Sequence, residues 1–155
     1  MDGVLAGLIA VVGTLLGSAL TYAFQHRTVD RAEGFARQER LRQERLATYS
    51  AFAGALTEHR RAVVNLWFRR QEDPGGPEHR AARLECDRLG AAVDHARFRV
   101  QLVADDPGLV ALANEAHRPT SEIHRAADHA ALRACEARCR EAVAAFIRAA
   151  ASEVR

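Results

Sequence analysis

The sequence has no Lys, only four Pro and three Cys, and aromatic residues make up 6% of its 155 residues. So few aromatic and turn-forming residues leave little from which to build an all-β sandwich or barrel. Three Cys exclude a disulfide-rich secreted scaffold and suit a reducing compartment. Ala (32 residues) and Arg (22 residues) are abundant instead, and with Leu and Glu they favour helix. The composition therefore predicts an all-α protein, and the length predicts about one domain of ordinary size.

The charge of the chain is nearly balanced. The 22 Arg stand against 20 Asp and Glu, which gives a formal net charge of +2. Nucleic-acid-binding domains usually concentrate a clear basic excess on one face. Nucleic acid is therefore not expected as the main partner, although it is not excluded.

The longest uncharged stretch runs from residue 3 to residue 24, and these 22 residues would span about 33 Å as a helix. We predict that it is a retained transmembrane anchor. The alternatives are a cleaved signal peptide and a buried core helix. A signal peptide would need a basic segment before the apolar stretch, whereas only Met1 and Asp2 precede it.

The residues that flank the anchor predict its orientation. Residues 25–45 carry six Arg, and no basic side chain precedes residue 3. Because basic flanks stay on the cytoplasmic side, we expect a single pass through the plasma membrane, with the N-terminus outside and the remaining chain in the cytoplasm.

Small residues recur within the anchor at steps of three and four. Such a stripe allows two helices to approach closely in a membrane, and it predicts self-association. Its candidate residues are Gly3, Gly7, Ala10, Gly13, Thr14 and Gly17. The alternative is that small residues are simply common in membrane helices.

Residues 25–45 are predicted to form a charged helical stalk next to the membrane. Residues 37–46 repeat the pentapeptide RQERL, and a five-residue period produces no apolar stripe on a helix. We favour a solvated stalk. The alternative is binding to anionic lipid headgroups, for which the local charge is low.

Residues 46–155 are predicted to form an antiparallel three-helix bundle with coiled-coil-like packing. The expected helices are about 46–72, 78–104 and 107–152, the last with a break near residue 119. Two Pro and two Gly within residues 73–77 separate the first two, and Asp106 followed by Pro107 is typical of a helix start. Apolar residues are expected in the core at helical spacing, and they are Leu46, Tyr49, Phe52, Ala53, Leu56, Val63, Leu66, Trp67, Ala82, Cys86, Leu89, Val93, Ala96, Val100, Val103, Leu132, Cys135, Cys139, Ala142, Val143, Phe146, Ile147 and Ala150.

Side chains with reactive or metal-binding groups form no familiar motif. Cys135 and Cys139 share one helix face, but His124 and His129 point about 140° apart, so four convergent metal ligands are missing. We expect no catalytic, cofactor-binding or metal-binding residues, and no enzyme. The seven His are expected on the surface; they are His26, His59, His79, His95, His117, His124 and His129.

One cluster on the first bundle helix is a candidate contact for a partner or a phosphate. His59, Arg60 and Arg61 are followed by Trp67, and these residue types can form phosphate or cation–π contacts. The alternative is that the cluster lines the solvated edge of the helix.

The order of these features resembles a known family. The sequence has the Gly-rich segment VVGTLLG at residues 11–17, an Arg/Glu/Gln stalk, and an RLA motif at residues 45–47. An Ala-rich helix then leads to the HRR motif at residues 59–61, and two further Ala/Arg-rich segments follow. In this order it is similar to the small actinobacterial membrane proteins called KilB-like, which are associated with plasmid transfer and spread in Streptomyces.

The resemblance implies a membrane-anchored helical protein without enzymatic activity, acting in conjugative plasmid spread. Its expected partners are membrane lipid, a second copy of the chain, and other membrane or transfer proteins. The alternative function is that of a membrane-tethered protein that binds nucleic acid.

Overall fold

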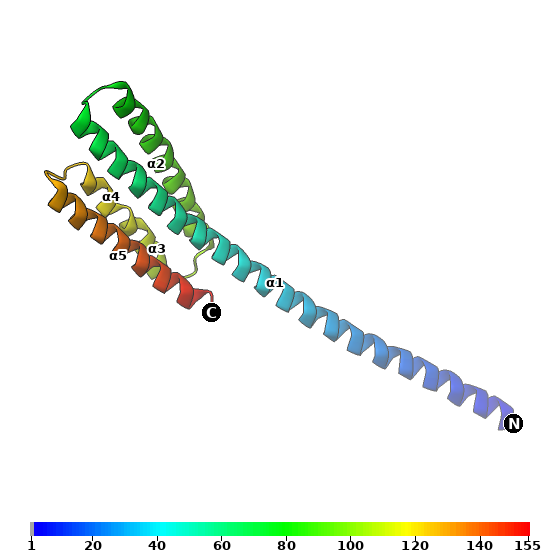
Figure 1. The fold of residues 1–155 in the computed structure, drawn as a ribbon. Coiled ribbons are helices and arrows are strands. Elements are labelled where there is room, and N and C mark those ends of the chain that lie inside the picture. The colour runs from blue at the N-terminus through cyan, green and yellow to red at the C-terminus, as the bar shows by residue number, and fades with distance from the viewer. Residues whose placement is uncertain (1) are drawn as a thin grey trace. The chain divides into compact units, whose positions relative to one another are not determined.

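The computed structural model describes the backbone of residues 2–155 and the side chains of residues 33–155. The chain forms two units, residues 1–41 and residues 42–155. We call the second unit the bundle. The helices of the chain are α1 (Asp2–Glu72), α2 (Pro77–Val103), α3 (Pro107–Ala116), α4 (Arg118–Ile123) and α5 (His129–Glu153) (Figure 1).

The predicted anchor, residues 3–24, lies outside the residues whose side chains are described, and so does its stripe of small residues. Among the described residues, no helix is both long enough and apolar enough to cross a bilayer. Residues 33–44 of α1 expose all their side chains, including Phe35 and Leu41.

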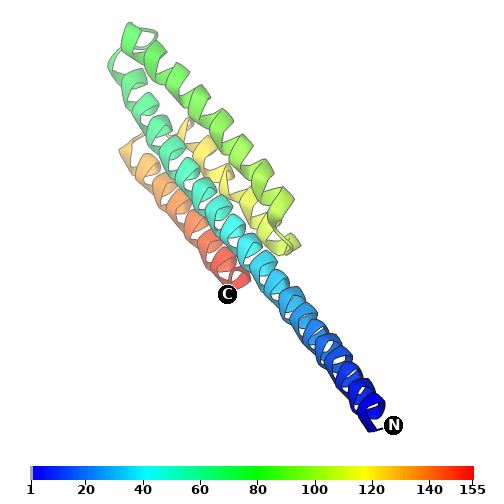
Figure 2. The ribbon, with the colours of Figure 1, turned by 90° about the vertical axis from the view of Figure 1, so that its right-hand side faces the viewer.

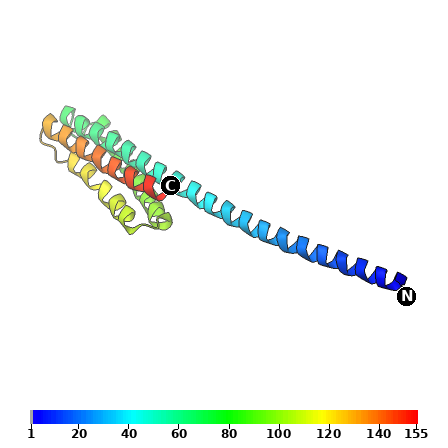
Figure 3. The ribbon, with the colours of Figure 1, turned by 90° about the horizontal axis from the view of Figure 1, so that it is seen from below.

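The bundle has four antiparallel helical segments, because α3 and α4 together form one of them. The prediction of three bundle helices was therefore wrong. The bundle segment of α1 is followed by α2, which returns beside it. The short helices α3 and α4 then run in the direction of α1, and α5 returns beside both α1 and the α3–α4 pair (Figures 1, 2 and 3).

The three-helix prediction failed because it missed the last reversal of the chain direction. The expected break near residue 119 is only a brief interruption, because Pro119 occupies the first turn of α4, where a missing N–H is tolerated. The chain instead reverses over residues 124–128, where one long helix was expected. The Asp128 carboxylate accepts a hydrogen bond from the backbone N–H of Ala131 at 2.8 Å and begins α5.

The end of α1, both ends of α2 and the start of α3 lie within one residue of their predicted positions, whereas α1 continues through residue 46 without a break. Pro77 begins α2, and the preceding turn contains Gly75 at φ +84°, a conformation that suits glycine. At the start of α3, Asp106 accepts a hydrogen bond from the backbone N–H of Gly108 at 2.8 Å, and Pro107 follows as expected.

The core consists of two apolar clusters along the bundle. The first surrounds Phe52 of α1 and Phe146 of α5, whose rings meet edge to face with centroids 4.9 Å apart. The second surrounds Trp67 and contains Cys135 and Cys139. Both thiols are buried, which confirms their prediction as small core residues.

Two residues that were expected in the core lie at the surface. Leu46 is 57% exposed and Ile147 is 49% exposed. Both line an apolar groove of about 460 Å³ between the first bundle turns of α1 and the last turns of α5. Their periodicity was correct, but the apolar stripe on each helix is wider than the face that its neighbours cover.

The two-cluster core predicts a large difference between two Leu→Ala substitutions. Leu56 is 2% exposed in the first cluster, whereas Leu84 is 71% exposed on α2. Leu56→Ala should lower the free energy of unfolding by about 2–5 kcal/mol because it leaves a cavity. Leu84→Ala should change it by less than about 0.5 kcal/mol.

The measurement is urea unfolding of the full-length chain in detergent micelles, followed by the fluorescence of Trp67, the single Trp in the sequence. Equal effects of the two substitutions would contradict the placement of Leu56 in the core.

Candidate functional site

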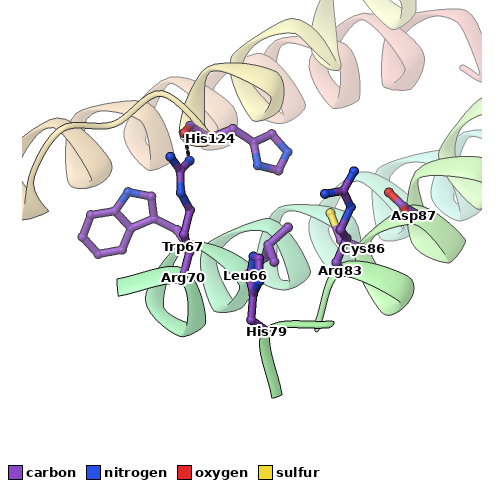
Figure 4. Close-up of a pocket in the computed structure, with 8 residues that line it drawn as sticks. All are labelled: Leu66, Trp67, Arg70, His79, Arg83, Cys86, Asp87 and His124. Carbon is purple, nitrogen blue, oxygen red and sulfur yellow. Dashed lines mark hydrogen bonds between the residues drawn. The ribbon is translucent and has the colours of Figure 1, made fainter. Parts of the chain in front are cut away.

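A cavity of about 380 Å³ lies where the α1–α2 turn meets the segment that joins α4 to α5. We call it the turn pocket. It combines apolar side chains with four basic ones and a single carboxylate (Figure 4). Its lining residues are Leu66, Trp67, Arg70, His79, Arg83, Cys86, Asp87 and His124.

The two arginines of the turn pocket come from different helices. Arg70 lies in the last turn of α1, and Arg83 lies in the second turn of α2. In the described part of the chain, neither guanidinium forms an ion pair with a carboxylate. The polar contact of Arg70 is a long one, from Nη1 to the backbone oxygen of His124 at 3.4 Å (Figure 4). Their positive charges are therefore not neutralised by a direct partner.

The two histidines add polar groups to the pocket. His79 accepts a hydrogen bond at Nδ1 from the backbone N–H of Gly75 at 3.0 Å, so its neutral ring carries the proton on Nε2. Burial lowers the pKa of His124, and the nearby Arg70 and Arg83 lower it further, against the opposing charge of Asp87. Burial is the main cause of this shift, and the two arginines add to it.

The apolar side of the pocket is rigidly held. The Trp67 indole donates from Nε1 to the backbone oxygen of Ala126 at 2.9 Å, which ties α1 to the segment before α5. Cys86 is buried, and burial raises the pKa of its thiol. The thiol therefore stays protonated near neutral pH and contributes packing rather than a nucleophile.

Behind Cys86, two histidines lie inside the bundle between the two apolar clusters. The rings of His59 and His117 stack with centroids 5.3 Å apart, and His59 Nε2 lies 3.8 Å from the Cys86 sulfur. The Nδ1 atoms of both rings are buried without a hydrogen-bond partner. Gly90 faces His59, and a Cβ at that position would lie 3.4 Å from Nε2, so a small residue leaves space for the ring.

The prediction that all histidines lie at the surface is wrong for His59, which is 7% exposed. Its side chain is directed into the core because it follows Phe52 and Leu56 at helical spacing. Burial lowers the pKa of His59 to about 4, and the neighbouring His117 and His124 act in the same direction. The carboxylates of Asp94 and Asp87 oppose this shift.

The predicted contact cluster does not form one surface. His59 and Trp67 are buried, so a solvated edge is wrong for these two residues. Arg60 forms an ion pair with Glu136 of α5 at 2.8 Å, while Arg61 is exposed. His59, Arg60 and Arg61 point in different directions because consecutive residues on a helix are about 100° apart.

The turn pocket was not predicted from the sequence. The pattern predicts His79 and His124 only as surface histidines and gives no role to Arg70 or Arg83. A signal was present, since an antiparallel helical hairpin places residues at similar distances from its turn side by side. Arg70, His79 and Arg83 lie within eight residues of Gly75. Among the described residues, no group of three or more His, Cys, Asp or Glu side chains is arranged to hold a metal ion.

Comparisons with known proteins give one family and one relative. A family model described as KilB plasmid transfer protein matches residues 46–154. Protein KilB of Streptomyces lividans is 33% identical over 147 residues, which cover 93% of this chain and 94% of that protein. No solved structure matches the chain.

The buried His59 predicts that the bundle loses stability in mild acid. Its pKa of about 4 in the folded state lies below the unfolded value of 6.5, so protons bind preferentially to the unfolded chain. The free energy of unfolding should therefore be unaffected by His59 above pH 6.5. It should fall between pH 6.5 and pH 4, by about 3 kcal/mol in total.

The measurement is urea unfolding of the full-length chain across this pH range. His59→Gln should flatten the decline, whereas His95→Gln, at an exposed position of α2, should leave it unchanged. The attribution to His59 fails if the wild-type and His59→Gln proteins decline in parallel.

Proposed function

Because the chain belongs to the KilB plasmid transfer protein family, we propose that it acts in plasmid transfer as a membrane-anchored helical interaction protein. This membership also confirms the family resemblance noted in the sequence. The observation that carries the proposal is the family match over residues 46–154, which coincides with nearly the whole bundle. The bundle is therefore the part through which the chain acts.

The uncharged segment at residues 3–24 supports the anchor. Its length suits a bilayer, and the six Arg of residues 25–45 support a cytoplasmic position for the bundle. The anchor holds the bundle at the plasma membrane, which is where a protein that assists DNA transfer between cells can meet its partners.

A role in binding rather than catalysis is supported by the placement of the reactive side chains. The three thiols are buried in the bundle, and burial raises the pKa of both Cys86 and Cys139. His59, the most deeply buried histidine described, faces other core residues. These groups stabilise and shape the bundle, and the bundle presents its surface to partners.

A mating experiment tests the proposal. Deleting this chain should lower the frequency of plasmid transfer or spread, and the intact gene should restore it. A chain without residues 3–24 should not restore it, because the bundle is no longer concentrated at the membrane. Leu84→Ala serves as the control for correct expression, since this exposed position does not support the fold.

Two results of this experiment would count against the proposal. Normal transfer in the absence of the chain would remove its role in transfer. Full restoration by the chain without residues 3–24 would remove the anchor from its function.

Self-association through the anchor predicts a second effect. In the stripe of small residues, Gly13 and Gly17 are four residues apart, and a leucine at either position would keep two helices from approaching closely. The double substitution Gly13→Leu and Gly17→Leu should lower the signal in a membrane two-hybrid assay by about tenfold, equivalent to a loss of about 1.4 kcal/mol.

The matched control is Ala19→Leu, which also adds bulk but falls on the opposite side of a helix from the stripe. It should leave the signal unchanged. An undiminished signal from the double variant would show that two copies of the chain do not associate through the stripe of small residues.

A further inference from the structure

The turn pocket brings two guanidinium groups to one cavity from opposite sides of a helical hairpin. Arg70 belongs to α1 and Arg83 to α2, and both line the pocket with His124 from the segment after α4 (Figure 4). Because three separate parts of the fold supply these groups, their convergence exists only in the folded bundle.

The charges in the pocket favour an anion. Arg70 and Arg83 carry two positive charges, and Asp87 is the single carboxylate among the lining residues. Elsewhere on the bundle, many arginines are neutralised directly, as Arg60 is by Glu136 and Arg138 is by Glu122. The pKa of His124 is lowered mainly by burial, and the charges of Arg70 and Arg83 lower it further against that of Asp87.

The donors suit a phosphate group in particular. Guanidinium groups present forked N–H donors that match the spacing of phosphate oxygens. The Nε2–H of His79 supplies one more donor, because its Nδ1 is occupied by the Gly75 backbone N–H.

The size of the cavity limits what accompanies the phosphate. A volume of about 380 Å³ lies at the lower end of the range for small-molecule pockets. Leu66 and Trp67 provide an apolar side for an organic group, and the Asp87 carboxylate can accept a hydrogen bond from a hydroxyl or amino group. These features favour binding of a small phosphorylated molecule over binding of a phosphate ion alone.

We propose that the turn pocket binds the phosphate group of a small phosphorylated molecule between Arg70 and Arg83. The proposal rests on the pocket and is independent of the role in plasmid transfer. Two kinds of molecule carry a phosphate group of this kind: a soluble phosphate ester and a phospholipid, in its headgroup. Either source would make the same contacts with the two arginines.

The test is isothermal titration calorimetry of the full-length chain in maltoside micelles, which contain no phosphate. The soluble probes are inorganic pyrophosphate and adenosine monophosphate, and the lipid probe is short-chain phosphatidic acid. If a probe binds, Arg70→Gln and Arg83→Gln should each raise its Kd by about tenfold or more, because each removes charged hydrogen bonds.

A matched control separates specific binding from general attraction. Arg99→Gln removes the same charge from the exposed side of α2, about 24 Å along the helix from Arg83. It should bind like the wild type. Because Arg70 and Arg83 are exposed, both test variants should fold, and their urea unfolding followed by Trp67 fluorescence verifies this.

Each outcome decides the proposal. Binding of a soluble probe that depends on Arg70 and Arg83 supports a soluble ligand, and the same dependence for phosphatidic acid alone supports a lipid headgroup. The absence of binding by all three probes overturns the proposal, as does an equal loss in Arg99→Gln.

A fourth probe, a single-stranded oligonucleotide without terminal phosphates, tests a macromolecular ligand. Binding that is tighter than that of adenosine monophosphate and is lost in the same two variants would assign the arginines to a nucleic-acid surface. That result would also overturn the proposal of a small ligand.

Discussion

The bundle depends on the burial of one face of α1. Tyr49, Phe52 and Leu56 of that face pack into the first cluster, and Val63 and Trp67 pack into the second. The large aromatic side chains matter because the remaining helices contribute mostly Ala, Val and Cys, which bury little area each. Polar contacts at both ends keep α5 beside α1: Tyr49 donates to Glu153 at 3.1 Å, and Trp67 donates to the carbonyl before α5. The register of these contacts determines where every other side chain on the bundle surface lies.

The interior is divided by the stacked His59 and His117. The Nδ1 atoms of both rings are buried without a hydrogen-bond partner, and burial favours the neutral form of His59 by lowering its pKa. Cys86 connects this layer to the turn pocket, since its sulfur contacts His59 and its side chain also lines the cavity. The core and the candidate site therefore share Leu66, Trp67 and Cys86, so a change in the packing of one alters the packing of the other.

The family match and the structure point to the same part of the molecule. The matched residues, 46–154, contain every residue of the two core clusters and every residue that lines the turn pocket. The apolar groove between α1 and α5 lies at the opposite end of the core from the turn pocket, so the two surface features are lined by separate sets of side chains.

Much of the fold was predictable because helix caps and apolar periodicity are local properties of a chain. The Pro and Gly residues of the first turn, the Asp106 cap and the four-three spacing on α2 each predicted the observed element. The reversal before Asp128 was missed, since a single capping residue is a weak signal beside a prominent Pro119. The sequence by itself determined that the chain is helical, where α2 and α3 begin, and which family it belongs to. Only the tertiary structure decided that four layers form, that His59 is buried, and that Arg70, Arg83 and His124 meet, because contacts between helices depend on the direction that each helix takes after its turn.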